Sequence, residues 1–415
     1  MTRAAAKRTA WGETVQKELE KRKREVRVIY VGTYIPRECG IATYTKDLTT
    51  AINILNPHYL AEIVAINEPD GHYDYPWEVK YRIEQEEPKS YIDAASYINQ
   101  SSAPIVSIQH EFGIFGGEDG EYILPFLDSL EKLVVTTLHT VLPEPSPNHK
   151  RIIRKIAEFS QALVVMAEVA AERLVTQYGL DEKKLIIVPH GVPDISYGPT
   201  YEAKKTLKLD GKKILLTFGL INPGKGIEYA ISALPEIIKK EKDILYLILG
   251  ETHPMVKKKE GEKYRESLVE LVRKLKLKNY VHFENQYLNL EELILYLKAT
   301  DLYLTPFLNP NQITSGTLAY ALGAGKACIS TPYIYAEEVL GNGRGVLVPF
   351  KSSEKIAQAI LDLLGDSEKR KKMEKRAYLF GRKMIWPKVA LDYLDLFWLI
   401  VKETKGNLSD QTSLF

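Results

Sequence analysis

Short apolar runs alternate with amphipathic segments along most of the chain and divide it into two halves. Each run has the length of a buried strand, and most are followed by a loop and a helical pattern. The first half has its predicted strands at Arg27 to Val31, Ala61 to Ile66, Ile105 to Gln109, Leu133 to Leu138, Gln161 to Met166 and Leu185 to Val188. The second half has them at Lys213 to Phe218, Leu245 to Leu249, Val281 to Phe283, Leu302 to Leu304, Ala327 to Ser330 and Gly345 to Val348. The alternation predicts an α/β protein with two doubly wound, Rossmann-like domains.

Three segments interrupt this pattern. Residues 67–91 are interpreted as a Tyr-rich connection, and residues 194–210, rich in Pro, Gly, Tyr and Lys, as the link between the domains. Ile385 to Val401 is aromatic and amphipathic, which predicts a helix that packs through its apolar side. We therefore expect an N-terminal domain at 26–200 and a C-terminal domain at 205–380.

Composition limits the classes of function. The 415 residues, 45% of them hydrophobic, are enough for two full cores. The formal net charge is only +2, which gives no global field for nucleic acid or an acidic polymer, so any anion site must be local. Residues 1–25 form a basic N-terminal extension with Trp11, Val15 and Leu19 at roughly helical spacing. We interpret it as an exposed helix, the alternative being a weak peripheral contact with anionic lipid headgroups.

The cysteines and the lengths of the apolar runs indicate the cellular compartment of the protein. Cys39 and Cys328 lie in separate halves and fit no metal spacing, which favours a reduced cytoplasmic chain. No apolar run reaches the roughly 18 residues of a spanning helix, and the N-terminus lacks the apolar core of a signal peptide. We expect a cytoplasmic protein, with peripheral contact at the inner membrane face as the alternative. No carboxylate pair has a cation-binding spacing, so no metal site is expected.

Polar residues follow several predicted strands of the first half, at the edge where parallel sheets bind ligands. Gly40 enters a helix after the first strand and would either let a ligand approach the backbone or serve a tight turn of positive φ. The remaining candidates at these strand ends are His110, Glu111, Glu118, His139 and His190. For His110, a buried structural histidine and a sugar-contacting one are equally open interpretations.

Two strand ends of the second half have the character of phosphate sites. Gly219 begins a loop in which Lys225 stands between two glycines ahead of a helix, where a lysine can place its charge on a diphosphate. The stretch from Thr305 to Gly325 passes through a polar loop and enters a helix at Ser315, Gly316 and Thr317. Free backbone N–H groups and small side chains at a helix entrance suit a phosphate, although an ordinary N-cap before a packed helix has the same sequence.

A set of motifs resembles the mannosyltransferase-like branch of the family 4 retaining glycosyltransferases, which have the GT-B fold. In chain order the motifs are TYIPRECGIATYTKDL, QHEFGIFGGEDGEY, VVTTLHT, IVPHGVPD, LLTFGLINPGKGIEYAISALPEI and SGTLAYALGAGKACISTP, within residues 26 to 400. The resemblance implies an acceptor-side N-terminal domain and a nucleotide-sugar donor domain facing it across a cleft. It also implies that residues 381–415 pack back on the N-terminal domain.

The resemblance assigns roles at matched positions. Gly40 corresponds to a glycine loop near the acceptor and the donor diphosphate, and His139 to a histidine beside the transferred sugar. Lys225 corresponds to the lysine on the donor diphosphate. Ser315 to Thr317 correspond to the helix entrance that holds the phosphates and sugar hydroxyls, while His110, Glu111, Glu118 and His190 remain candidate acceptor or sugar contacts.

Two positions depart from the family pattern. Leu220 stands where an arginine is usual, five residues before the lysine, and the two glutamates of the Glu-x7-Glu signature are Gln312 and Tyr320. Gln312 can hydrogen-bond a sugar hydroxyl but cannot stabilise positive charge as a carboxylate would. Candidate replacements for the carboxylate are Glu111, Glu118 and Glu338, of which we favour Glu338, so that the predicted catalytic set is His139, Gln312 and Glu338.

The resulting hypothesis is a retaining transferase that moves a hexose, mannose first and glucose second, from a nucleotide diphosphate sugar to a saccharide or lipid-linked acceptor. The donor would be GDP-mannose or another nucleotide diphosphate hexose, with no cofactor and no metal. The alternatives are a glycoside phosphorylase on the same fold and a non-catalytic nucleotide-sugar or glycan-binding protein. The acceptor loops vary freely on such a scaffold, so the sequence does not identify the acceptor.

Overall fold

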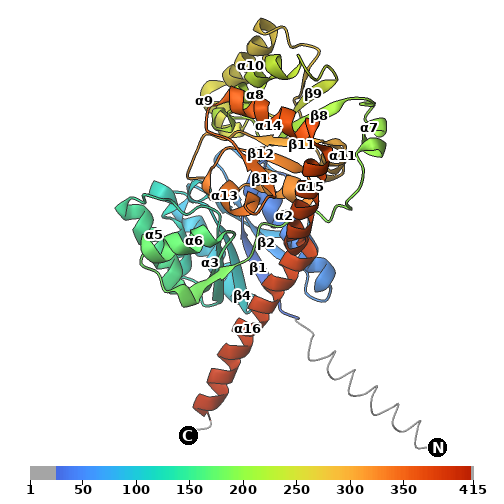
Figure 1. Cartoon of the computed structure of the whole chain (residues 1–415). Helices are drawn as coiled ribbons and strands as arrows, with labels where there is room; N and C mark the ends of the chain where they lie inside the picture. The colour runs from blue at the N-terminus through green and yellow to red at the C-terminus, as the bar shows by residue number, and fades with distance from the viewer. Residues whose placement is uncertain (1–24, 413–415) are drawn as a thin grey trace, which may run out of the picture.

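The computed structural model describes residues 25–412, with side chains to residue 404. The basic N-terminal extension, including the predicted helix through Trp11, lies outside the described residues. Figure 1 shows two α/β units, one above the other, with the C-terminal helix α16 (Trp386–Thr412) beginning at their junction.

The first sheet has seven parallel strands in the order β3-β2-β1-β4-β5-β6-β7. Its strands are β1 (Val28–Gly32), β2 (Glu62–Asn67), β3 (Val79–Glu84), β4 (Ile105–His110), β5 (Leu133–Leu138), β6 (Ser160–Val165) and β7 (Leu185–Ile187). Its helices are α2 (Gly40–Leu55), α3 (Pro88–Gln100), α4 (Ile123–Asp128), α5 (Pro147–Phe159) and α6 (Glu168–Thr176). Short 3-10 turns lie at η1 (Phe112–Ile114), η2 (Glu118–Gly120) and η3 (Glu182–Lys184).

The second sheet has six parallel strands in the order β10-β9-β8-β11-β12-β13. Its strands are β8 (Lys213–Phe218), β9 (Ile244–Leu249), β10 (Val281–Glu284), β11 (Leu302–Thr305), β12 (Ala327–Ser330) and β13 (Gly345–Leu347). Its helices are α7 (Tyr201–Thr206), α8 (Ile227–Ile237), α9 (Pro254–Glu260), α10 (Lys263–Lys274), α11 (Leu290–Ala299), α12 (Gly316–Gly323), α13 (Ile334–Leu340), α14 (Ser353–Gly365) and α15 (Ser367–Gly381). The 3-10 turns here are η4 (Pro223–Lys225) and η5 (Arg382–Met384).

The edge strand β3 lies within the segment that we interpreted as a Tyr-rich connection, so that interpretation was wrong for residues 79–84. Only Ile83 of this strand is fully buried, while its other residues are half-buried or exposed. The continuous apolar run that marks the central strands is therefore missing. The link region likewise contains a short helix, α7, which contacts α11 of the second unit.

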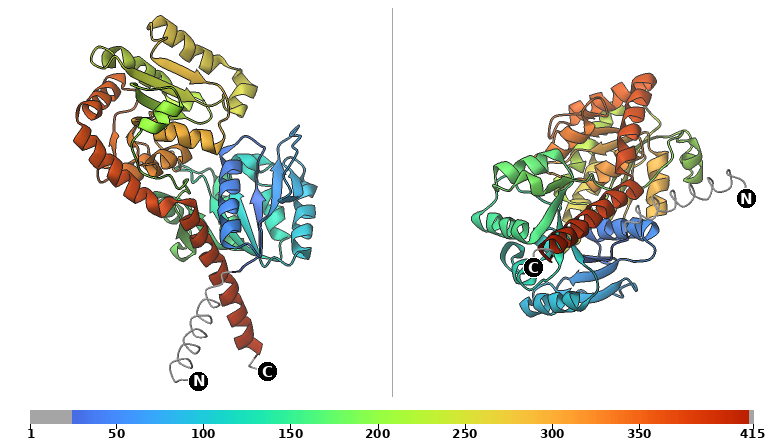
Figure 2. Two further views of the ribbon diagram at one scale, coloured as in Figure 1. Left: turned by 90° about the vertical axis from the view of Figure 1, so that its right-hand side faces the viewer. Right: turned by 90° about the horizontal axis from the view of Figure 1, so that it is seen from below.

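The chain crosses between the two units twice, and the two crossings lie side by side. Val192 donates its N–H to the carbonyl of Met384 at 2.8 Å, and Trp386 donates its N–H to the carbonyl of Val192 at 2.9 Å. Beyond this point α16 packs against α2 on the first sheet, as the view from below in Figure 2 also shows. One apolar cluster of buried residues continues from the first unit into the second.

Candidate active site

The loop after β8 places a lysine at the carboxyl edge of the second sheet. Gly219 has φ +100°, a conformation that a side chain disfavours, and a Cβ atom there would lie 3.4 Å from Lys225 Nζ and 2.9 Å from Thr317 Cγ2. Lys225 and the entrance of α12 therefore meet at Gly219. The backbone of Gly219 lies between these two groups.

The environment of Lys225 is mostly apolar. Its side chain is 8% exposed, its Nζ lies 3.4 Å from the carbonyl of Phe218, and its charge lies over the ring of Phe307 at 4.7 Å. Burial lowers the pKa of Lys225 to about 8. Among the described residues this ammonium has no carboxylate partner. An anionic ligand would therefore offset the free-energy cost of burying its charge.

The first turn of α12 carries a capping serine and two unpaired backbone N–H groups. Ser315 caps the helix by accepting the N–H of Leu318 at 3.3 Å, and its hydroxyl lies 3.4 Å from that of Thr317. The N–H groups of Gly316 and Thr317 belong to the first turn and have no partner inside the helix. Together with Lys225 they form an anion-binding edge.

His139 lies at the corresponding edge of the first sheet. His110 pairs with Leu138 in the β4–β5 register, which puts His139 directly beyond the end of β5. Its Nε2 lies 3.0 Å from Gln109 Oε1, and its ring packs edge-on against Tyr44 at 4.8 Å. Burial, with smaller contributions from His190 and His110, lowers the pKa of His139 to about 3, so the ring is neutral at physiological pH.

His190 connects the two units. Its ring packs against the same Tyr44 at 5.2 Å, and a Cβ atom at position 316 would lie 2.9 Å from its Nε2. Only glycine leaves room for this approach to α12. Burial lowers the pKa of His190 to about 4, partly offset by its hydrogen bond to the carbonyl of Gly191. The fold therefore brings together His139, His190, Gly316 and, through Gly219, Lys225.

Gly40 begins α2 in a helical conformation, and a Cβ atom there would meet nothing within 4 Å. The positive-φ turn that we held open for it is absent. The preceding residue, Cys39, caps the helix by accepting the N–H of Ala42 at 3.3 Å. The helix entrance at Gly40 therefore has the space that a ligand would need, and its contact with a ligand stays a prediction.

Of the remaining candidates at the strand ends of the first sheet, His110 accepts the N–H of His139 at its backbone carbonyl at 3.0 Å, and Glu111 contacts the following residue, Thr140. Glu111 accepts the N–H of Phe112 at 3.0 Å and the hydroxyl of Thr140, and burial raises its pKa. His110 is fully buried against Phe112 and Phe115, and burial lowers its pKa to about 3. Glu118 is exposed in η2, where its carbonyl accepts a hydrogen bond from Asn148.

Two predicted catalytic residues hold structural contacts. Glu338 on α13 accepts the N–H groups of Glu168 and Val169, at 3.1 and 3.3 Å, and so caps α6 of the other unit. Gln312 donates its amide to the carbonyl of Thr314 at 3.0 Å. Direct contact of either side chain with a sugar stays a prediction.

Several residues of the site were missed at the sequence level. Asp47 of α2 accepts a hydrogen bond from Tyr320, and Gln109 contacts His139. His253 follows β9, and its pKa is lowered by burial and by the charge of Lys225. Its position after a strand could have revealed His253, whereas Asp47 lies inside an amphipathic helix and carries no comparable signal.

Within residues 25–412, no group of three or more His, Cys, Asp or Glu side chains is placed to hold a metal ion. None of the helices in the same part of the chain is long and apolar enough to cross a membrane.

Comparison with known sequences identifies the second unit. Residues 200–380 match the family described as glycosyl transferases group 1. An uncharacterized glycosyltransferase of Methanocaldococcus jannaschii is 27% identical over 257 residues, which are 60% of this chain and 61% of that protein. The match thus spans about three fifths of the length of that relative.

Solved structures share the whole architecture. Sucrose-phosphate synthase from Thermosynechococcus elongatus superimposes with a TM-score of 0.72 at 16% identity, over 91% of this chain and 100% of that one. An Anabaena protein solved in complex with UDP and glucose gives a TM-score of 0.68 at 12% identity, over 89% and 99% of the two chains. These likenesses confirm the predicted GT-B fold. Residues 200–380 thus have the sequence of a glycosyl transferases group 1 domain, and the whole chain has the GT-B fold.

Proposed function

We propose that the protein transfers a hexose from a nucleotide diphosphate sugar to a saccharide or lipid-linked acceptor, with retention of the anomeric configuration. Mannose is the first choice of sugar and glucose the second. The observation that carries the proposal is the meeting of Lys225 with the open N-terminus of α12, opposite two neutral histidines of the other domain.

The donor diphosphate would lie on Lys225 and on the N–H groups at the entrance of α12. When the bond to the sugar breaks, negative charge accumulates on the departing diphosphate, and fixed donors at that position lower the barrier without reorganising. Leu220 supplies no second cation there, so Lys225 carries the charge compensation with the helix dipole. The proposal includes no metal ion.

His139 would act as a neutral hydrogen-bonding group for the transferred sugar. Its pKa of about 3 favours a neutral ring over an imidazolium acid near pH 7. The contact between Nε2 and Gln109 fixes the ring orientation, and Gln312 is the proposed second contact to a sugar hydroxyl. Closure of the domains around the donor would keep water away from the reactive sugar.

The donor nucleotide is the first thing to determine. The protein should be screened by calorimetry against GDP, UDP and ADP sugars, with GDP-mannose and UDP-glucose as the leading pair, because a structural neighbour was solved with UDP and glucose. We expect one nucleotide sugar to bind and its affinity to fall when Lys225 is replaced by Met. Absence of binding to every nucleotide sugar would overturn the proposal, and tight binding without turnover on a broad acceptor panel would favour a non-catalytic role.

A further inference from the structure

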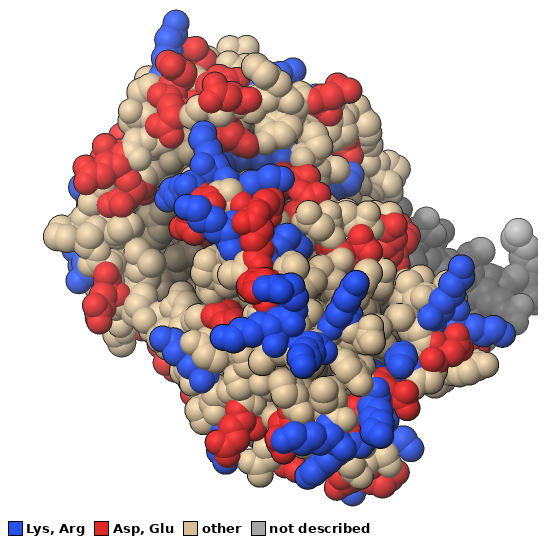
Figure 3. All heavy atoms as spheres, turned by 90° about the horizontal axis from the view of Figure 1, so that it is seen from above, with Lys and Arg blue, Asp and Glu red and all other residues tan. Residues whose placement is uncertain are grey.

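A histidine without a role in the proposed reaction lies beside the phosphate-binding lysine. His253 stands between β9 and α9, at the carboxyl edge of the second sheet. The face of the protein seen in Figure 3 carries Lys and Arg in separate clusters with Asp and Glu among them, so charge alone does not mark a diphosphate site on it. A diphosphate site is then recognised by donors that the fold holds in place.

The backbone around His253 is bonded to the loop that carries Lys225. Ile221 donates its N–H to the carbonyl of Glu251 at 2.7 Å, and His253 donates its N–H to the carbonyl of Ile221 at 2.8 Å. These bonds form a parallel bridge between the two loops, at Ile221 and Thr252. The loop after β9 therefore has a fixed place beside the loop after β8.

Two glycines bring these loops into direct contact. A Cβ atom on Gly250, which has φ +128°, would lie 2.4 Å from the carbonyl oxygen of Gly219. A Cβ atom on Gly219 would in turn lie 3.4 Å from Lys225 Nζ. Lys225 and the loop that leads to His253 therefore pack against the same glycine.

The helix α10 anchors the loop after β9. Arg265 is 8% exposed and donates its Nε to the hydroxyl of Thr252 at 3.3 Å and its Nη2 to the carbonyl of Gly250 at 2.5 Å. The hydroxyl of Thr252 donates to Glu262. These bonds hold the loop without a ligand, so a donor on it needs no reorganisation when a ligand binds.

The same loop lies opposite the first domain. Burial and the charge of Glu251 raise the pKa of Glu38, and the charge of Lys257 on α9 offsets part of this. Glu38 belongs to the loop that leads into α2 at Gly40. A ligand bound between the entrance of α2 and the second domain would therefore meet the loop that carries His253.

The capping bond of α9 determines which ring nitrogen of His253 carries the proton. Nδ1 accepts the N–H of Met255 at 3.2 Å, and a nitrogen that accepts a hydrogen bond carries no proton. The proton of the neutral ring is therefore on Nε2. Burial, and to a smaller extent the charge of Lys225, lower the pKa of His253, which keeps the ring neutral near pH 7. His253 thus has an uncharged N–H donor of fixed orientation.

We propose that Nε2–H of His253 donates a hydrogen bond to an oxygen of the donor diphosphate, as a second side-chain group beside Lys225. The inference rests on the proposed function, because it needs a nucleotide diphosphate sugar as the ligand. A diphosphate extends over two phosphate groups, whereas the ammonium of Lys225 is a single point charge. A neutral donor beside it stabilises the departing diphosphate without a further buried charge.

The first test is calorimetric titration with GDP-mannose, UDP-glucose and ADP-glucose. His253→Ser keeps a capping side chain for α9 but is too short to reach the ligand, whereas His253→Ala also loses the cap. Both variants should bind the donor about tenfold more weakly than the wild type. Only His253→Ala should lose thermal stability. A loss of affinity in His253→Ala alone would mean that His253 serves only as a cap, and would overturn the proposal.

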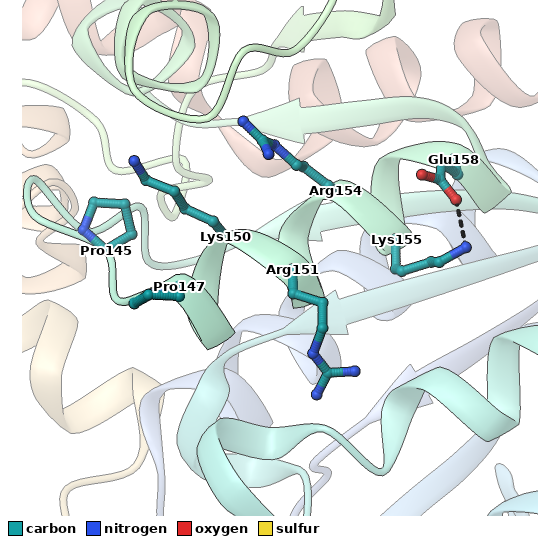
Figure 4. Close-up of a pocket in the computed structure, with 7 residues that line it drawn as sticks. All are labelled: Pro145, Pro147, Lys150, Arg151, Arg154, Lys155 and Glu158. Atoms are coloured by element: carbon teal, nitrogen blue, oxygen red, sulfur yellow. Dashed lines mark hydrogen bonds and ion pairs between the residues drawn. The ribbon is translucent and has the colours of Figure 1, made fainter.

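Two variants serve as matched controls, and both should bind like the wild type. His282→Ser changes an exposed histidine of the neighbouring strand β10. Lys150→Met changes a cation in a hollow of about 470 Å³ along α5 of the first domain, which Arg151, Arg154 and Lys155 also line (Figure 4). It reports on anions that collect on cations elsewhere on the protein. A loss in either control as large as that in His253→Ser would contradict the assignment.

The ring nitrogens of His253 give a readout that a helix cap alone would not change. In protein labelled with ¹⁵N-histidine, the NMR signals missing from His253→Ser belong to this residue. We expect them to show the Nε2–H form without ligand, and the Nε2 signal to move when the donor saturates the protein. An Nε2 signal that stays in place at saturation would exclude the hydrogen bond.

The inference and the proposed function fail in different ways. If none of the three nucleotide sugars binds the wild type, both are wrong. If one binds with an affinity that depends on Lys225 but not on His253, the proposed function stands and the inference is wrong. The nucleoside without phosphate should bind the wild type and His253→Ser alike, and an equal loss there would move the contact of His253 from the diphosphate to the nucleoside.

Discussion

Tyr320 of α12 donates a hydrogen bond of 2.6 Å to Asp47 Oδ2 of α2, across the junction of the two domains. Tyr320 is the position at which the sequence resemblance implies a glutamate, and this hydrogen bond brings a carboxylate of the opposite domain next to it. Burial raises the pKa of Asp47, and the hydrogen bond from Tyr320 partly offsets this. A second bond, between Thr43 and Tyr287 at 2.7 Å, joins the same helix to the second domain.

Removing the hydroxyl in Tyr320→Phe should lower the free energy of unfolding by about 1 to 3 kcal/mol, because Asp47 loses a partner in a largely buried place. The measurement is chemical denaturation. Asp47→Asn in the Tyr320→Phe background should cost less than Asp47→Asn alone. Strictly additive effects would show that the hydrogen bond contributes nothing to stability.

Donor affinity should depend on pH through Lys225. Its pKa of about 8 means that the free ammonium loses its proton as pH rises through 8, while a bound diphosphate favours the charged form. We expect the affinity for the nucleotide sugar to be constant between pH 6 and about 7.5 and to fall toward pH 9.5, measured by calorimetry. Lys225→Arg keeps its charge throughout this range, so the slope should disappear in that variant.

Acid should destabilise the protein through its buried histidines. The pKa values of His110, His139 and His190 lie at about 3, 3 and 4, below the ordinary value of 6.5. Between pH 6.5 and these values the unfolded chain binds more protons than the folded one, so stability is complete above pH 6.5 and is lost as pH falls. Each histidine contributes a slope of about 1.4 kcal/mol per pH unit.

His110→Phe tests this in the core of the first domain, where the ring packs among phenylalanines and a ring of similar shape can replace it. The variant should show a shallower loss of stability between pH 6 and pH 4.5 than the wild type, by denaturation at several pH values. A matched surface change, His58→Phe, should leave the slope as it is. An unchanged slope in His110→Phe would mean that this histidine is not kept neutral by folding.

The alternation of apolar runs was sufficient to predict the central strands of both sheets because those strands are buried on both faces. The half-exposed edge strand β3 lacked this signal. The meeting of Lys225 with the entrance of α12 could be predicted because both lie in loops that follow strands, and strand order determines where those loops lie. Contacts such as Asp47 with Tyr320, or His190 with Gly316, depend on how the domains are placed against each other, which no local pattern records.

Glu338 was predicted from the sequence to contact the sugar, whereas in the structure it binds the N-terminus of a helix in the other domain. Its carboxylate caps α6, so Glu338→Gln should lower the free energy of unfolding by about 1 kcal/mol through the loss of charge at a helix N-terminus. Thermal and chemical denaturation measure this. If Glu338 also contacts the sugar, the folded variant will lose turnover at saturating donor. Glu337→Gln, one position earlier on α13, serves as the control.

The paired backbone bonds of Val192 with Met384 and Trp386 determine how the domains can move. Two chain segments connect the domains at the same place. Translation of one domain relative to the other would break both hydrogen bonds. Rotation about the line through the two segments is therefore the least costly relative movement of the domains. The ring of Trp386 fills the space beside Gly191, where a Cβ atom would lie 2.2 Å from it, so any side chain at position 191 would displace the ring from this junction. The connection between the two domains therefore lies beside the candidate site, because the ring of Trp386 packs near that of His190 at 6.2 Å.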